Sequence, residues 1–200
     1  MTLRESDLHP DPLEQFRQWL KQAQAAGIRN ADAMTVATAT RDGRPSARVV
    51  LMRGLDKRGF AFFTNYESAK GGELAANPRA ALVFYWEDLG RQVRVTGTVA
   101  RVSAEESERY FSTRPRESRV AAWASRQSAV IESRAALEER FGELDAAYPG
   151  EDVSLPPFWG GYRVSPETIE FWEHRDSRLH DRLRYTRRPD GGWTIERLSP

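Results

Sequence analysis

Two arginines bracket a short apolar run in the first third of the chain. Arg48 and Arg53 stand at the two ends of Arg-Val-Val-Leu-Met-Arg. Because side chains alternate between the two faces of a strand, these two guanidinium groups should leave it on opposite sides. Arginine binds phosphate and carboxylate groups through paired N–H donors. Two interpretations remain open: one arginine is solvated and the other protects a sheet edge, or two anionic groups are held near one strand.

A phenol, a guanidinium and a hydroxyl recur at a spacing of four residues. Tyr110 and Arg114 lie one helical turn apart, and Ser118 follows four residues later. If these groups converge on one side of the chain, they form a clamp for a phosphate. The alternative is an arginine-rich helix end that neutralises its own carbonyl groups.

Polar donors also gather where two aromatic segments end. One group follows a hairpin that we predict for residues 48–65, around the polar turn at 56–59. The other group follows Trp123. The first group is Thr64, Asn65, Ser68 and Lys70, and the second includes Gln127 and Ser128.

Cationic and titratable side chains follow Trp172 near the end of the chain. Arg178, His180 and Arg182 alternate, so they share one face if this segment is extended. His180 is the nearby group that titrates around neutral pH. The alternative is a solvated loop.

The composition limits the classes of function. The 200 residues carry 30 lysines and arginines against 29 aspartates and glutamates, a net charge of +1. That balance argues against a general electrostatic grip on nucleic acid or on a membrane surface. Without cysteine there is no disulfide, thiolate nucleophile or iron–sulfur cluster. The sequence has no signal-peptide core and no run of transmembrane length, so we expect a cytoplasmic protein.

Common cofactor and catalytic motifs are missing from the sequence. G-x-G-x-x-G, G-x-x-x-x-G-K-[ST] and G-x-S-x-G do not occur. His174 and His180 are six residues apart without a clear third ligand, so we predict no metal site. Phosphate binding would have to come from side chains and backbone rather than from a glycine loop that opens a helix.

The pattern of elements predicts a mainly β domain with short helices over residues 1–200. A helix is expected over about residues 11–26, because Asp11 can cap it, Pro12 can open it and Gly27 can end it. Alternation over 91–102 predicts a strand with one buried face. Further strands are expected at 34–40, 80–86, 160–164, 168–172, 183–186 and 193–198, and helices at 71–77, 103–111 and 133–147. Closely spaced strands of this kind favour a closed or nearly closed antiparallel barrel.

Eight ordered blocks of the sequence resemble the pyridoxamine 5′-phosphate oxidase family, FMN-dependent enzymes of vitamin B6 metabolism. The blocks are Arg-Val-Val-Leu-Met-Arg, Phe-Phe-Thr-Asn, Glu-Leu-Ala-Ala-Asn-Pro-Arg, Arg-Gln-Val-Arg-Val-Thr-Gly, Tyr-Phe-Ser-Thr-Arg-Pro, Ala-Trp-Ala-Ser-Arg-Gln-Ser, Pro-Pro-Phe-Trp-Gly-Gly-Tyr-Arg-Val and Arg-Leu-His-Asp-Arg. They extend over about residues 7–200, which makes the resemblance more specific than any single motif.

The resemblance implies an FMN-binding split β-barrel that works as a homodimer, with two flavin sites built from both subunits at the interface. By position in the motifs, the residues expected to bind FMN are Arg48, Arg53, Phe63, Thr64, Lys70, Gln92, Gln127, Ser128, Trp172 and Arg182. Those expected to bind a phosphorylated B6 substrate are Arg53, Tyr110, Arg114, Ser118, Arg178 and His180. Arg178 and His180 would lie over the substrate ring as the catalytic pair. Opposite faces of the arginine strand would then serve two different phosphates.

The reaction implied is oxidation of pyridoxamine 5′-phosphate and pyridoxine 5′-phosphate to pyridoxal 5′-phosphate. A hydride passes to flavin N5, oxygen accepts the electrons, and hydrogen peroxide is the second product. One alternative is a related split-barrel flavin oxidase that acts on another ring, such as a phenazine precursor. The other is a binding protein without catalysis.

Three features depart from the family pattern. Arg53 stands where members often have lysine, and Ala69 stands where an arginine often precedes the lysine equivalent to Lys70. No counterpart is expected to the longer N-terminal arm of some members. The second and third departures bear on affinity more than on the type of reaction.

Overall fold

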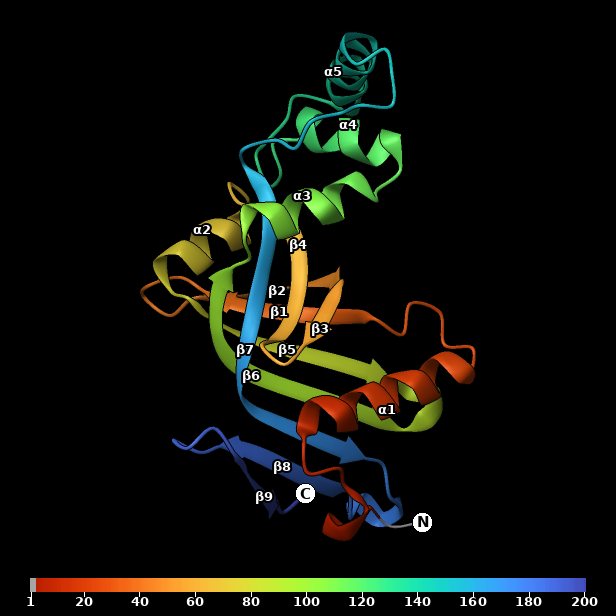
Figure 1. The fold of residues 1–200 in the computed structure, drawn as a ribbon, viewed down its shortest axis with the longest axis vertical. Helices are drawn as coiled ribbons and strands as arrows, with labels where there is room; N and C mark the ends of the chain where they lie inside the picture. Colours follow the sequence, from red (N-terminus) through yellow and green to blue (C-terminus); the bar gives the residue numbers. More distant parts are fainter. Residues whose placement is uncertain (1–2) are drawn as a thin grey trace.

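The computed structural model describes residues 3–200, so the first two residues of the predicted domain lie outside it. Within this range nine strands form one antiparallel sheet with short helices around it (Figure 1). The strands are β1 (Ala33–Ala39), β2 (Pro45–Leu51), β3 (Gly54–Asp56), β4 (Gly59–Asn65), β5 (Arg79–Trp86), β6 (Arg91–Arg101), β7 (Trp159–Glu173), β8 (Asp181–Arg187) and β9 (Trp193–Arg197). The α-helices are α1 (Pro12–Ala25), α2 (Ala69–Ala76), α3 (Ala104–Ser112), α4 (Arg116–Ala124) and α5 (Arg134–Ala147). The prediction of a mainly β chain with short helices is confirmed.

The two longest strands connect the two ends of the molecule. The strand order is β2-β1-β5-β6-β7-β4-β3, and β8 and β9 continue from β7. The pairing of β6 with β7 shifts register between Thr96 and Gly97, opposite Pro166, which has no N–H to donate to a ladder. Such a bulge bends a strand, and Figure 1 shows β6 and β7 curving from the end near α2 and α3 toward α1.

Helix α1 covers the apolar face of the sheet. Asp11 caps it by accepting a hydrogen bond from the Leu13 backbone at 2.8 Å, as the Asp-Pro pair predicted. Phe16 is fully buried, with its ring 5.0 Å from that of Phe60 and 4.7 Å from that of Phe84. Burying such a side chain contributes about 2 kcal/mol to stability. The core therefore fixes β4 and β5 relative to α1.

The single hairpin predicted for residues 48–65 is wrong. Strand β2 pairs with β1, and only Gly54–Asp56 pairs with β4. Between these strands the Met52 N–H donates to the backbone carbonyl of Asp32 at 2.9 Å, and the Arg53 N–H donates to the backbone carbonyl of Ala61 at 2.8 Å. The chain thus changes pairing partner at these two residues, and Arg53 follows β2 rather than belonging to it.

Two further elements differ from the prediction. The strands expected at 160–164 and 168–172 are one strand, β7, because an extra residue of β7, Glu167, forms a bulge that lets the pairing with β6 continue past Pro166. Helix α4 was not predicted, and it places Ser118 in a helix rather than in a turn.

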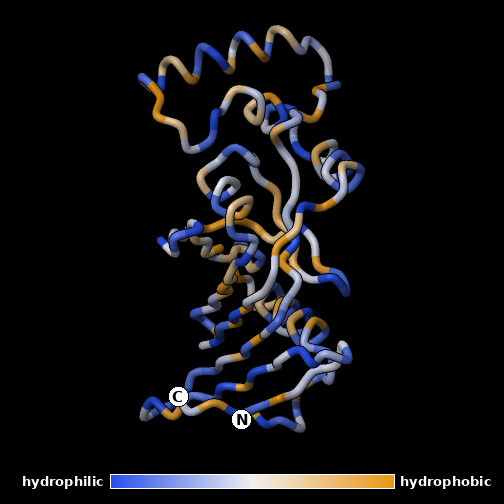
Figure 2. Tube along the Cα trace, turned by 90° about the vertical axis from the view of Figure 1, so that its left-hand side faces the viewer, coloured by the Kyte–Doolittle hydropathy of each residue, from blue (hydrophilic) through white to orange (hydrophobic). Residues whose placement is uncertain are grey.

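Helices α3, α4 and α5 extend from one end of the sheet (Figure 1). Helix α5 has no buried residue among those described, and Figure 2 shows hydrophilic and hydrophobic residues alternating along it. Arg116 holds α5 to the start of α4, since its guanidinium contacts the Asp145 carboxylate and donates to the Gly150 carbonyl at 2.9 Å. The loop 125–133 between α4 and α5 carries Gln127 and Ser128 back toward β4.

Candidate functional site

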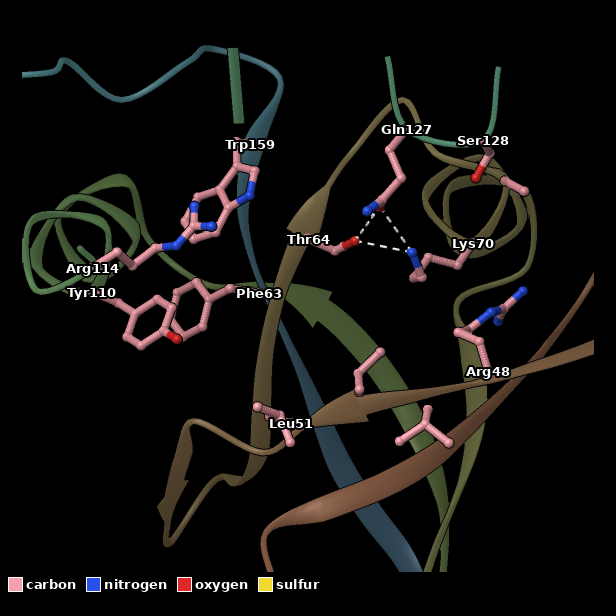
Figure 3. A pocket seen from close by; sticks show the side chains of 13 residues that line it. Arg48, Leu51, Phe63, Thr64, Lys70, Tyr110, Arg114, Gln127, Ser128 and Trp159 are labelled. Carbon is pink, nitrogen blue, oxygen red and sulfur yellow. Dashed lines mark hydrogen bonds between the residues drawn. The ribbon is translucent and has the colours of Figure 1, made fainter. Parts of the chain in front are cut away.

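A cavity of about 560 Å³ opens between β2, β4, α2, α3 and the loop 125–133 (Figure 3). Eight of the predicted site residues line it, and we call them the cavity cluster: Arg48, Phe63, Thr64, Lys70, Tyr110, Arg114, Gln127 and Ser128. Val49, Val50, Leu51, Ala69 and Trp159 complete the lining. In Figure 3 the cations lie on two sides, with Arg114 on one wall and Lys70 and Arg48 on the other.

Lys70 is a buried cation whose contacts are neutral oxygens. Ser68 caps α2 and so fixes the first turn, which places Lys70 against β4. Its ammonium donates to the Thr64 hydroxyl at 3.1 Å and to the Gln127 amide oxygen at 2.9 Å. Burial, together with the positive charge of Arg48, lowers the pKa of Lys70. Within residues 3–200 no carboxylate forms an ion pair with this ammonium, so its charge is available to an anion.

Arg48 is oriented by a carboxylate from α2. Its guanidinium lies 3.3 Å from Glu73 and donates to the Ser46 hydroxyl at 2.6 Å. The Glu73 carboxylate also accepts from Thr38 and Ser46. Burial alone would raise the pKa of Glu73, but the hydrogen bonds from Thr38 and Ser46 and the charge of Arg48 lower it. Glu73 therefore stays ionised and holds Arg48 at the edge of the cavity.

Arg114 lies among aromatic rings on the opposite wall. Its guanidinium carbon is 4.7 Å from the centre of the Trp159 ring, and burial lowers its pKa. Phe63 stacks on Tyr110 at 4.0 Å and on Trp159 at 5.7 Å. Nη1 of Arg114 is buried and has no hydrogen-bond partner in the described part of the chain. A buried donor without an acceptor is costly, and a bound anion would satisfy it.

A second group of predicted residues lies near the other ends of β6 and β7. Gln92 pairs with Trp172 across the β6–β7 ladder, and Trp172 pairs with Arg182 across β7–β8, so these three side chains share one sheet face. The His180 ring lies 4.7 Å from that of Trp172. We call Gln92, Trp172, His180 and Arg182 the strand cluster. Arg182 is paired with Glu170 at 2.8 Å, and this hydrogen bond raises its pKa.

The hydrogen bond to His180 assigns its neutral tautomer. The Arg175 backbone N–H donates to Nδ1 of His180 at 3.1 Å. A backbone amide can only donate, so Nδ1 carries a lone pair and the proton of the neutral ring is on Nε2. The nitrogen left for a ligand is therefore a donor.

The remaining predicted residues lie outside both clusters. Arg53 is paired with Asp32 at 3.0 Å, and Ser118 is half-buried in the first turn of α4. Arg178 is exposed with φ of +61°, next to Ser177 with φ of +57°. Two successive residues in the left-handed region are costly for side chains with a Cβ, which indicates a loop held in a defined shape.

The two clusters are separated along β7. Trp159 begins this strand beside the cavity cluster, and Trp172 lies 13 positions later in the strand cluster. At about 3.3 Å per residue, that interval corresponds to about 40 Å of strand. One chain therefore does not bring the clusters together around one ligand.

Two residues of the site had no role predicted from the sequence: Trp159, which lines the cavity, and Glu73, which pairs with Arg48. Trp159 lies within a block that reads equally well as apolar core, and Glu73 is one of many helical glutamates. The Phe-Trp-Gly-Gly run could have indicated that Trp159 packs closely against other residues, because paired glycines beside a tryptophan are typical of close packing. No local signal marked Glu73, whose partner Arg48 is 25 residues away in the sequence.

The described residues contain no group of three or more His, Asp or Glu side chains that could hold a metal ion. In the same range, no helix is long and apolar enough to cross a membrane.

Two family models match the chain. Residues 20–146 match the model described as pyridoxamine 5′-phosphate oxidase. Residues 159–200 match a model described as the pyridoxine 5′-phosphate oxidase C-terminal dimerisation region. The second match contains Trp172, His180 and Arg182 of the strand cluster.

Curated relatives match the chain over nearly its whole length. A pyridoxine/pyridoxamine 5′-phosphate oxidase from Paraburkholderia phymatum is 60% identical over 195 residues, covering 98% of this chain and 92% of that protein. A protein of the same name from Rubrobacter xylanophilus is 57% identical, with 99% and 91% of the two chains covered.

Solved structures show the same fold. PhzG from Burkholderia lata, in complex with tetrahydrophenazine-1-carboxylic acid, superposes with a TM-score of 0.93 at 33% identity, covering 100% of this chain and 98% of that one. A pyridoxamine 5′-phosphate oxidase-related, FMN-binding protein from Nostoc punctiforme superposes with a TM-score of 0.74 at 19% identity, over 92% and 97% of the chains. The predicted split-barrel fold is confirmed.

Proposed function

The chain belongs to the pyridoxamine 5′-phosphate oxidase family, a family of oxidoreductases, and we propose that FMN is its cofactor. Its reaction is the oxidation of pyridoxamine 5′-phosphate and pyridoxine 5′-phosphate to pyridoxal 5′-phosphate. Oxygen accepts the electrons and is reduced to hydrogen peroxide. The cytoplasmic location expected from the sequence stays a prediction.

One observation carries this proposal: the buried Lys70 and the half-buried Arg114 face one cavity from opposite walls, and neither has a carboxylate partner in residues 3–200. Within residues 3–200, neither the Lys70 ammonium nor the Arg114 guanidinium forms an ion pair. A single phosphate would need only one such wall. Two phosphate esters, one on a cofactor and one on a substrate, account for both.

The residues around Lys70 fit the phosphate of FMN. Lys70, Arg48 and Gln127 supply donors on one wall, and Ser128 adds a hydroxyl at the rim of the same cavity. We assign the FMN phosphate to these four residues, and Phe63 and Thr64 to the same flavin. Ala69 has no side-chain donor where members of the family often have arginine, so Arg48 and Lys70 carry more of the charge.

Tyr110 and Arg114 fit the phosphate of the vitamer. They come from α3 and from the turn that follows it, which places both on the wall opposite Lys70. Arg53 and Ser118 belong to this proposed phosphate site by family position. In this structure Arg53 is paired with Asp32 through Nη1.

We assign completion of the site to a second copy of the chain. Exposed apolar side chains accompany both clusters: Val49 at the cavity is 68% exposed, and Leu179 beside His180 is 70% exposed. Tyr85, which pairs with Gln92 across β5 and β6, is 57% exposed. The match of residues 159–200 to a dimerisation region supports a second copy of the chain as the partner. The partner's strand cluster, together with its Arg178, would then complete each cavity.

The chain's own groups bind and orient the substrate. When bound, FMN supplies the acceptor for a hydride from the substrate carbon and the route for those electrons to oxygen. Arg178 and His180 are the proposed catalytic residues over the substrate ring. Because His180 presents Nε2–H, it donates a hydrogen bond and does not take the substrate's proton at that nitrogen.

The most direct test is spectroscopic. Purified protein should show a flavin absorbance band, and adding pyridoxamine 5′-phosphate without oxygen should bleach it. Admitting oxygen should then restore the band and release hydrogen peroxide. A fully FMN-loaded sample that is not bleached contradicts the proposal.

The likeness to PhzG, whose structure holds a phenazine compound, supports a second candidate: oxidation of another ring substrate at the same flavin. Such a substrate without phosphate would not need Arg114. An Arg114→Ala variant with an unchanged Michaelis constant for pyridoxamine 5′-phosphate would favour this candidate.

A further inference from the structure

Arg114 lies between two aromatic side chains rather than beside an acid. Its guanidinium carbon is 4.7 Å from the centre of the Trp159 ring (Figure 3) and 5.5 Å from that of Phe111. Phe111 is fully buried, and only 8% of the surface of Trp159 is exposed. The two rings contact each other edge to face at 5.1 Å. This pair of rings therefore forms a fixed seat for the guanidinium.

An aromatic seat has a different effect from a carboxylate. A ring face attracts a cation through its quadrupole, but it does not neutralise the charge or take up the N–H donors. Arg48 shows the contrast, because its guanidinium donates to Glu73 and Ser46. The buried Nη1 of Arg114 has no acceptor anywhere in residues 3–200. Arg114 thus keeps both its charge and a free donor for a ligand.

Trp159 is also tied to Tyr110, the other member of the proposed clamp. The rings of Trp159 and Tyr110 are nearly parallel, at 8°, and each stacks on Phe63. The position of Trp159 is set by β7, where it pairs with Asn65 across the ladder to β4. One side chain anchored in the sheet therefore orients a phenol and a guanidinium that come from α3 and the turn after it.

We propose that Trp159 is a positioning residue for the substrate phosphate, acting through Arg114. It holds the guanidinium in place as an uncompensated cation, so that the cavity favours phosphorylated over unphosphorylated vitamers. This inference rests on the proposed function for the identity of the substrate. The claim that Trp159 organises an anion site can be tested by binding alone.

The test compares Trp159→Phe, which keeps a ring face, with Trp159→Leu, which does not. In FMN-loaded protein, we expect Trp159→Leu to raise KM for pyridoxamine 5′-phosphate about 10-fold and to lower kcat by less than about threefold, and Trp159→Phe to raise KM less than about threefold. Calorimetry with pyridoxal 5′-phosphate should show the same losses of affinity. FMN affinity should change less than about twofold.

Two controls separate positioning from general damage. Trp193→Leu, in β9, removes a tryptophan whose ring centre lies 5.8 Å from the guanidinium carbon of Arg187. This variant should leave KM unchanged. In an Arg114→Met background, Trp159→Leu should have no further effect on pyridoxal 5′-phosphate affinity. Additive losses in the double variant, or equal losses of FMN and substrate affinity, would overturn the inference.

If Trp159→Leu does not fold, replacing Trp159 with a ring-fluorinated tryptophan weakens the ring quadrupole at nearly the same shape. A KM that rises with fluorination supports the inference, and a KM that does not change overturns it. Failure of the proposed function would look different. Wild-type protein would then bind pyridoxal 5′-phosphate in a Trp159-dependent way without turning over the vitamer.

Discussion

The cavity cluster and the strand cluster both contain cationic side chains, but their charges are balanced differently. In the strand cluster, Arg182 is paired with Glu170, which raises its pKa. In the cavity cluster, burial lowers the pKa of Lys70 and of Arg114, and within residues 3–200 neither forms an ion pair. A site that binds an anion must keep charge uncompensated, whereas a site that orients a ring can use neutral or paired groups. The difference supports the proposed assignment of the phosphates to the first cluster and of ring orientation to the second.

Arg114→Ala should have the largest effect and should act on the substrate alone. Charge-assisted hydrogen bonds contribute about 1.5–3 kcal/mol, so we expect KM for pyridoxamine 5′-phosphate to rise about 100-fold. FMN affinity should be nearly unchanged. Steady-state kinetics of FMN-loaded protein measure this, with Arg109→Ala, at an exposed position of the preceding helix α3, as the matched control. A loss of FMN together with substrate would break the division into two phosphate sites.

Lys70→Met should give the complementary result. Loss of one charged donor is expected to weaken FMN binding about 30-fold. Flavin fluorescence titration measures the affinity, and KM at saturating FMN should stay within about twofold. Lys57→Met, in an exposed turn, is the control. If KM rises as much as the FMN Kd, the two walls of the cavity do not serve different phosphates.

His180 tests the other side of the comparison. His180→Gln keeps a donor near the Nε2 position, whereas His180→Asn keeps only an acceptor near Nδ1. If donation is the role, kcat should fall less than about fivefold in the glutamine variant and about 10- to 100-fold in the asparagine variant. A general base would contribute about 10²–10⁴-fold and would be lost in both variants. Equal, large losses therefore contradict the tautomer assignment.

The sequence predicted what local chemistry determines. The Asp-Pro start of α1 and the alternation along β6 were both confirmed. The pairing of strands could not be predicted from the local sequence. The residues of β2 were predicted to form a hairpin with those of β4, yet β2 pairs with β1. The sequence around Pro166 was divided into two predicted strands, yet β7 continues through it, because Glu167 forms a bulge in the pairing with β6.

The same limit applies to the candidate site. Motif positions identified eight residues that the structure brings to one cavity, because their blocks resemble a family. The roles of Trp159 and Glu73 depend on contacts with Arg114 and Arg48, which are distant in the sequence. Whether the predicted residues act as assigned stays a prediction, as does the single domain over 1–200.

The smallest expected effect is that of Glu73→Gln on the free energy of unfolding. The pKa of Glu73 is lowered in the folded state, so its contribution is present above its ordinary value of 4.5 and is lost as pH falls through the folded pKa. Glu73→Gln should lower the free energy of unfolding by about 1 kcal/mol at pH 7, and the difference from wild type should shrink toward pH 3. Urea unfolding at both pH values measures this, with the exposed Glu67→Gln as control. A constant difference would show that the charge of Glu73 is unimportant.

The central claim is that the cavity cluster of one chain works with the strand cluster of another. Subunit complementation tests it most directly, by mixing an Arg114→Ala, Lys70→Met chain with a His180→Asn, Arg182→Leu chain and allowing the subunits to exchange. Each homodimer should be nearly inactive. The exchanged mixture should recover about a quarter of wild-type activity, because about half of the dimers have one of two sites intact. Confirmed heterodimers with no recovered activity would contradict the account.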